Sequence, residues 1–156
     1  MVESRLTWMK PIACVFAAAV VVQGSLLAQE NPVLATVAAP AVLMARSAPA
    51  AEEGVAGQSR QVIISVTGFT PPHDGSVQAV VKARSDGSQE EREIGRFGVF
   101  PNAEFRASDL SKAQRYGLPL PQELAGAKAL KLHVYLVPLR GDGSSARLEL
   151  GGAEIR

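Results

Sequence analysis

Hydrophobic and polar residues alternate in several short segments between residues 60 and 156, and turn-forming residues separate these segments. The alternation is clearest over residues 129–137, where Leu130, Leu132, Val134 and Leu136 share one face. A period of two residues is typical of a β-strand with one buried face. On this basis we predict strands over residues 61–67, 77–84, 93–100, 129–137, 147–150 and 153–155.

One helix is expected within this series of strands. Ser108 is a favourable N-cap, Asp109 suits the positive end of a helix, and Gly117 followed by Pro119 would end it. The aromatic residues that follow residue 28 all lie between residues 60 and 156, so the core belongs there. We predict a mainly β domain over residues 60–156, a small antiparallel β-sandwich or partly open barrel with one short helix.

The first 28 residues have the features of a secretory signal peptide. Arg5 and Lys10 precede twelve consecutive apolar residues, and small residues follow. Twelve residues span about 18 Å as a helix, whereas the hydrocarbon core of a membrane is about 30 Å thick. We predict cleavage after Ala28, with Gly24 as a competing point, and therefore an extracytoplasmic protein, periplasmic or secreted, without a membrane span. An uncleaved anchor over residues 11–28 is the alternative.

Residues 29–59 are rich in alanine, contain Pro32, Pro40 and Pro49, and lack aromatic residues. Proline interrupts helices, and this composition supplies few large side chains for a core. We therefore predict a disordered Ala/Pro-rich linker over residues 29–59. The apolar groups at residues 33–34 and 42–44 leave open a transient contact with a partner, in place of an idle spacer.

The charge composition excludes a nucleic-acid-binding protein. The chain has 16 Lys and Arg and 15 Asp and Glu, and residues 1–28 hold two of the basic and one of the acidic residues. The remainder is therefore neutral. Proteins that bind nucleic acid normally have a basic excess, because contacts with phosphate supply most of their affinity.

Few residues are available for catalysis or metal binding. The only cysteine, Cys14, lies in the predicted signal peptide, and His73 and His133 are the only histidines. After cleavage the chain therefore lacks disulfides, thiolate sites and any site of three imidazoles within one copy. We expect His133 on the solvent face of its strand, opposite the leucines, and His73 in a loop.

Residues 141–146 (GDGSSA) fit the pattern G-x-G-x-x-A of dinucleotide-binding proteins. That function requires a helix directly afterwards, whose N-terminus holds the pyrophosphate. A strand is expected after residue 146 instead, so we interpret the segment as a hairpin turn. We predict that the chain is not an enzyme and has no cofactor and no metal site.

Three segments carry a resemblance to a known family: residues 94–101 (IGRFGVFP), 132–141 (LHVYLVPLRG) and 148–155 (LELGGAEI). They resemble the C-terminal β domain that follows the copper-binding core of plant polyphenol oxidases and bacterial tyrosinases. In that family the β domain covers a copper site that six histidines of the separate core hold. This chain has two histidines, so the resemblance implies the covering domain without the oxidase activity.

The resemblance implies a non-enzymatic exported accessory or shielding domain that binds a tyrosinase-like type-3 copper oxidase. Phe100 and Phe105, on either side of a turn, are candidate anchors for the partner's substrate entrance; an ordinary place in the core is their alternative. A second interpretation is a generic periplasmic or surface protein-binding module with no copper connection. A third, a small copper carrier, is disfavoured because Met44 would be the only methionine or cysteine left after processing.

Overall fold

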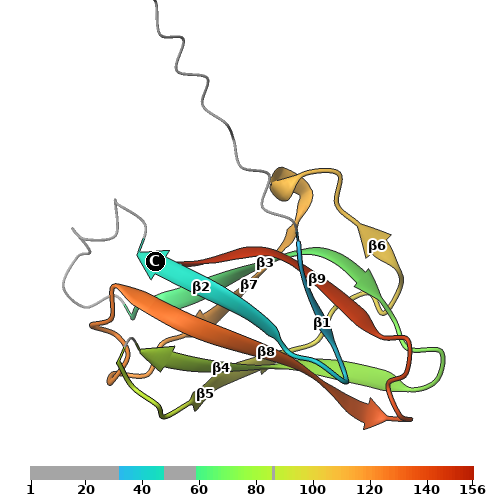
Figure 1. Cartoon of the computed structure of the whole chain (residues 1–156). Coiled ribbons are helices and arrows are strands. Elements are labelled where there is room, and N and C mark those ends of the chain that lie inside the picture. Colours follow the sequence, from blue (N-terminus) through green and yellow to red (C-terminus); the bar gives the residue numbers. More distant parts are fainter. Residues whose placement is uncertain (1–31, 48–58, 86) are drawn as a thin grey trace, which may run out of the picture.

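Nine β-strands and a single turn of 3-10 helix make up the structure, a computed structural model that describes residues 32–47, 59–85 and 87–156 (Figure 1). The mainly β fold predicted from the sequence is confirmed. The predicted signal peptide, residues 1–28, lies outside the described residues. The strands are β1 (Val33–Thr36), β2 (Ala41–Ser47), β3 (Gln61–Thr70), β4 (Ser76–Ser85), β5 (Arg92–Phe97), β6 (Phe105–Arg106), β7 (Gln114–Pro119), β8 (Ala129–Arg140) and β9 (Arg147–Ile155).

The alternation that predicted the strands reflects burial on one face. In β8, Leu130, Leu132, Val134 and Leu136 are all buried, and the residues between them point outward. The two last predicted strands are one strand, β9. In its ladder with β3 the register shifts at Gly151, which has no partner, so a β-bulge joins the two parts.

Hydrogen-bonded strands follow the order β5-β4-β8-β2-β9-β3-β6, with β1 paired to β9 and β7 paired to β3. Most neighbours are antiparallel, as predicted. However, β2 runs parallel to β9 over three residue pairs, Ala45 to Ser47 against Ala153 to Ile155. The sheet is therefore mixed, which corrects the purely antiparallel prediction.

The sheet curls until β5 and β7, near its two ends, face each other. The ring of Phe97 in β5 stacks on that of Tyr116 in β7, with centroids 4.2 Å apart. A Cβ atom at Gly95 would lie 2.9 Å from Leu118, so glycine permits this close approach. No backbone ladder joins β5 to β7 within the described ranges, and the sheet is therefore an open one.

Residues 33–47, predicted to belong to a disordered linker, form β1 and β2 within the sheet. The linker prediction for residues 29–59 is therefore wrong for these residues. Residues Ala41 to Arg46 of β2 pair with β8, and the end of the strand pairs with β9. Ala41, Leu43 and Ala45 are buried. Alanine is large enough at positions 41 and 45 because leucines of the neighbouring strands fill the core there. Residues 29–31 and 48–58 lie outside the described residues.

Arg60 connects the end of β2 to the loop between β7 and β8 through hydrogen bonds. Its guanidinium donates hydrogen bonds to the Ser47 hydroxyl at 2.6 Å and to the Ala125 carbonyl at 2.5 Å. The Ser47 amide also donates to the Lys128 carbonyl at 3.0 Å. Arg60, where the domain was predicted to start, thus contacts Ser47, which lies within the predicted linker.

The expected helix after Ser108 is reduced to one 3-10 turn, Leu110–Lys112. Asp109, not Ser108, is its N-cap and accepts a hydrogen bond from the Ser111 amide at 2.9 Å. The following residues alternate in burial and pair with β3 as β7, so strand pairing replaces the helix that the capping residues predicted. No helix in the described part of the chain is long and apolar enough to cross a membrane.

Candidate functional site

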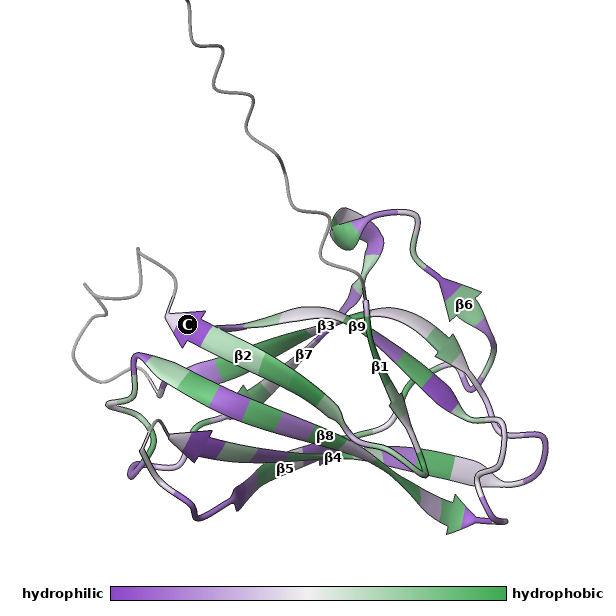
Figure 2. Cartoon of the chain, viewed as in Figure 1, coloured by the Kyte–Doolittle hydropathy of each residue, from purple (hydrophilic) through white to green (hydrophobic). Residues whose placement is uncertain are grey.

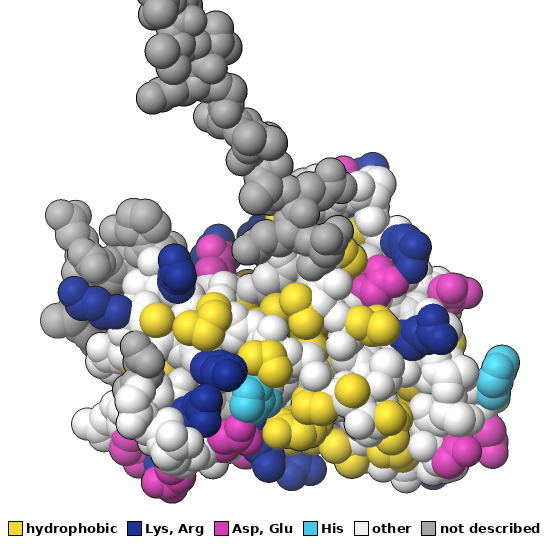
Figure 3. Space-filling model, in the orientation of Figure 1, with side chains coloured by type: hydrophobic (Ala, Val, Ile, Leu, Met, Phe, Trp, Pro, Cys, Tyr) yellow, Lys and Arg dark blue, Asp and Glu magenta, His cyan; other side chains and the backbone are white. Residues whose placement is uncertain are grey.

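Most of the exposed large hydrophobic side chains lie on one outer face of the molecule. Eight such side chains are exposed among the described residues, and six of them belong to β1, β2, β8 or the turn between β1 and β2. Figure 2 shows the hydrophobic positions along these strands, and Figure 3 shows hydrophobic side chains across the middle of the same view. We call this surface the apolar face and define it by Leu34, Val37, Val42, Met44, Val137 and Leu139.

The strand period explains how β2 contributes to both the core and the apolar face. Ala41, Leu43 and Ala45 point inward, whereas Val42 and Met44 point outward and are 42% and 52% exposed. Both faces of this strand therefore carry apolar side chains. A strand with one wet face normally places polar residues there.

The surface changes from apolar to basic on crossing from β2 over β8 to β4. One row of cross-strand neighbours is Met44, Lys131 and Arg84, and the next is Val42, His133 and Lys82. We call Lys82, Arg84 and Lys131 the basic strip. None of these three cations lies within 4.0 Å of a carboxylate of the described residues. The ammonium group of Lys82 instead lies 5.2 Å from the ring centroid of Tyr135.

Glu91 connects the loop before β5 to the outer side of β8. One carboxylate oxygen contacts Nδ1 of His133, and the other accepts a hydrogen bond from the Tyr135 hydroxyl at 3.4 Å. Burial, and then the nearby Glu91 carboxylate, raise the pKa of Tyr135. The prediction that His133 lies opposite the leucines is confirmed. No local pattern predicts the contact of His133 with Glu91, because this contact depends on how β4 pairs with β5 and β8.

A hollow of about 450 Å³ opens on the apolar face where β1 and β2 separate along β9. β1 pairs with residues 147–150 of β9, and β2 pairs with residues 153–155. Gly151 and Gly152, between these two parts, line the hollow without side chains. The face therefore has a depression that an apolar side chain of a partner can fill.

The two predicted anchors, Phe100 and Phe105, differ in their exposure and in their surroundings. Phe100 follows β5, precedes a cis proline and is 86% exposed, so the alternative of a core position is wrong for it. Phe105 is half-buried in β6 and packs against the core. Phe105 lies in β6, which pairs with β3, and Phe100 follows β5, which pairs with β4. Neither strand pairs with β1, β2 or β8, so the anchors do not extend the apolar face. Their role in partner binding stays a prediction.

The remaining candidate residues lie in turns. His73 is exposed in a bend, as predicted, and its amide donates to the Ser145 hydroxyl at 3.2 Å. Residues 141–146 form the connection between β8 and β9, with Gly141, Gly143 and Ser145 at positive φ. GDGSSA is thus a turn and not the start of a helix, but it does not join a hairpin: β8 and β9 do not pair with each other, because β2 lies between them. In the described part of the chain, no three His, Cys, Asp or Glu side chains are grouped as a metal site requires.

Comparisons with known proteins do not assign this chain to a family. No protein-family model matches it, and no curated protein matches it. The resemblance to the C-terminal β domain of tyrosinases therefore rests on the three sequence segments alone and stays a prediction.

Proposed function

We propose that this chain is a non-enzymatic, exported protein-binding domain that holds its partner on the apolar face. The observation that carries the proposal is the concentration of exposed hydrophobic side chains on β1, β2 and β8. Monomeric proteins rarely expose large contiguous apolar surfaces, and those that do commonly use them for binding. Export is proposed from the N-terminal sequence pattern.

The backbone beneath this surface supports a preformed binding site. β2 is paired with β8 from Ala41 to Arg46 and with β9 at its end, from Ala45 to Ser47, so Val42 and Met44 project from a strand that is held along one whole edge and at the end of the other. Side chains on such strands need little ordering when a partner binds, which lowers the entropic cost of association. The hollow beside Met44 offers a place for one apolar anchor of the partner.

Site-specific photo-cross-linking tests the proposal. A photoreactive phenylalanine analogue at Met44 should give one dominant cross-linked product in the native organism, whereas the same analogue at Phe100 should not. Phe100 is the control because it is 86% exposed but follows β5, outside the apolar face. The double substitution Val42→Ser, Met44→Ser should lower recovery of the partner at least tenfold, and Phe100→Ser should leave it unchanged. Equal cross-linking from both positions would contradict the proposal.

The exposure of Phe100 favours a second candidate, the shielding of a type-3 copper oxidase. A ring that is 86% exposed on a turn is suited to fill the substrate entrance of such an enzyme. Added to a tyrosinase from the same organism, the full chain should lower diphenol oxidation, and Phe100→Ser should restore it. Inhibition that is absent, or that Phe100→Ser leaves intact, would remove this candidate.

A further inference from the structure

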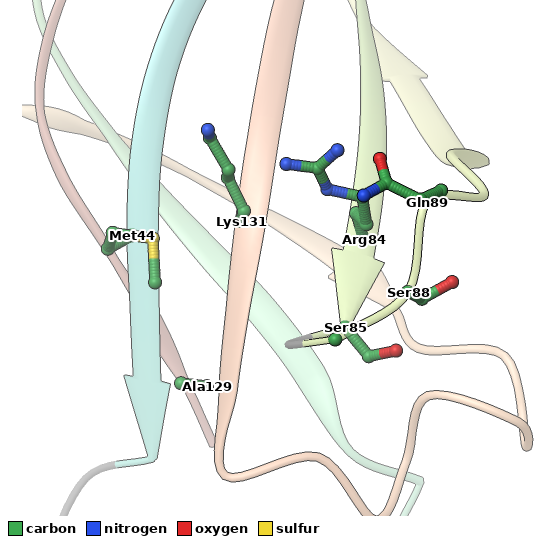
Figure 4. Close-up of a pocket in the computed structure, with 8 residues that line it drawn as sticks. Met44, Arg84, Ser85, Ser88, Gln89, Ala129 and Lys131 are labelled. Carbon is green, nitrogen blue, oxygen red and sulfur yellow. The ribbon is translucent and has the colours of Figure 1, made fainter.

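A pocket of about 290 Å³ lies beside the apolar face, between the end of β4, the turn after it and β8. Arg84 and Lys131 line it together with Met44, Ala129, Ser88 and Gln89. Figure 4 shows the Arg84 side chain extending from β4 toward β8, which carries Lys131, and the Gln89 side chain pointing from the turn toward the same space. Cationic, amide and apolar groups thus surround one small space.

The two cations of this pocket are direct cross-strand neighbours. Arg84 pairs with Lys131 in the antiparallel β4–β8 ladder, and both side chains are on the outer side of the sheet. Like charges in directly opposite positions destabilise a sheet, since their Cβ atoms are only about 5 Å apart. Both residues are also half-buried, so water screens their repulsion less than at a fully exposed site.

An anion between the two cations would relieve this repulsion. The guanidinium group of arginine matches carboxylate and phosphate oxygens with two parallel hydrogen bonds, and lysine adds a point charge. The Gln89 amide can donate another hydrogen bond. Met44 and Ala129 line the same pocket and suit an apolar group attached to the anion.

We propose that this pocket binds an oxyanion, a carboxylate or a phosphate, carried by an otherwise apolar molecule. The proposal requires no protein partner and stands apart from the proposed function. The oxyanion would contact Arg84 and Lys131, and the apolar part would lie against Met44 toward the apolar face. Phosphate and carboxylate sources share the chemistry of the head group, and separate titrations distinguish them.

The test is an NMR titration of the full-length ¹⁵N-labelled chain with hexanoate, hexyl phosphate, inorganic phosphate and hexanol. Hexanoate or hexyl phosphate should cause saturable shifts at the amides of residues 84–85, 87–89 and 129–131. The tighter of the two identifies the head group. Inorganic phosphate should bind more weakly, and neutral hexanol should cause no saturable shift there. Absence of saturable shifts with both amphiphilic anions would overturn the proposal.

Matched variants separate a specific site from general attraction of anions. Arg84→Gln with Lys131→Gln should weaken binding at least tenfold, whereas Lys112→Gln with Arg115→Gln, which removes the same charge elsewhere, should not. Equal weakening by both double variants would overturn the proposal.

Thermal unfolding gives a second readout. Without anion, the Arg84→Gln, Lys131→Gln variant should unfold at the same or a higher temperature than the unsubstituted chain. The anion should raise the unfolding temperature of the unsubstituted chain only, because it binds the folded state there. A lower unfolding temperature of the anion-free variant would show that the chain itself satisfies the two cations, and would also overturn the proposal.

Discussion

Residues 32–47 and residues 59–156 differ sharply in composition, yet they belong to one sheet. The first region has no aromatic residue and is rich in alanine, whereas the second holds the rings that stack between β5 and β7. Nevertheless Ala35, Ala41 and Ala45 are among the least exposed residues of the molecule, each at 1% or less. Burial in this protein is therefore not a matter of side-chain size.

This difference in composition shows that a strand such as β2, which lies between two other strands, can be built largely from small residues. The leucines of β8 and β9 fill the interior next to β2, so β2 needs only to close the backbone ladder and avoid clashes. Pro32 and Pro40 lie just outside β1 and β2, where proline interrupts no ladder. The same prolines suggested a linker when the sequence was considered alone.

Removing the first region should have the largest effect. A chain without residues 1–47 would leave β8 and β9 without the strand between them and expose leucines of both. We expect this chain to lose cooperative thermal unfolding, measured by circular dichroism, while a chain that begins at Pro32 keeps it. A cooperative transition of unchanged midpoint in the shorter chain would restore the independent domain over residues 60–156 that the sequence predicted.

Substitutions at neighbouring positions of β2 should differ by several-fold in their cost. Leu43→Ala should lower the free energy of unfolding by about 2–4 kcal/mol, because Leu43 is buried and its removal leaves a cavity. Met44→Ala should cost less than about 0.5 kcal/mol, since Met44 is half exposed. Chemical denaturation measures both values. If neither substitution lowers the free energy of unfolding, Leu43 of β2 contributes nothing to the stability of the core.

The strands between residues 61 and 155 were largely predictable because alternation and turn residues agree there. β8 begins at Ala129 as predicted, and the turn over residues 141–146 follows it. β1 and β2 were missed because apolar residues occupy both faces of β2, which hides the period of two. The helix was overpredicted because Asp109 caps only one turn before the alternation of β7 begins.

The candidate site was predictable only in part. The outward position of His133 follows from alternation within one strand, so the sequence was sufficient. The apolar face and the basic strip arise from the register of β2, β8 and β4, which are far apart in the chain. Pairing of distant strands cannot be deduced from local pattern, so the sequence pointed to Phe100 and Phe105, on either side of a turn, and not to the apolar face.

Acidification should loosen the turns of the second region before it affects β2. A hydrogen bond from the Ser144 amide lowers the pKa of Asp142, and bonds from Ser111 and Ser108 lower the pKa of Asp109. Because the folded pKa lies below the unfolded value of about 3.8, each carboxylate stabilises the fold above that value. This stabilisation is lost as the pH falls through the folded pKa.

Amide exchange at pH 5 and pH 3 tests this difference between the regions, after correction for the intrinsic effect of pH. Protection should fall at residues 109–112 and 142–144 and hold in β2, since residues 32–47 contain no acidic side chain. Asp142→Asn should abolish the pH dependence in its own turn only. Equal loosening of β2 and the turns would contradict the expectation.

Hydrogen exchange of the full chain at neutral pH tests most directly the claim that residues 32–47 belong to the folded core. The amides of β2 that are bonded in its ladders should exchange as slowly as those of Leu132 and Val134 in β8, because both would require global unfolding. If β2 exchanges many times faster than β8 under the same conditions, it opens independently. That result would contradict the claim that residues 32–47 complete the sheet and carry part of the apolar face.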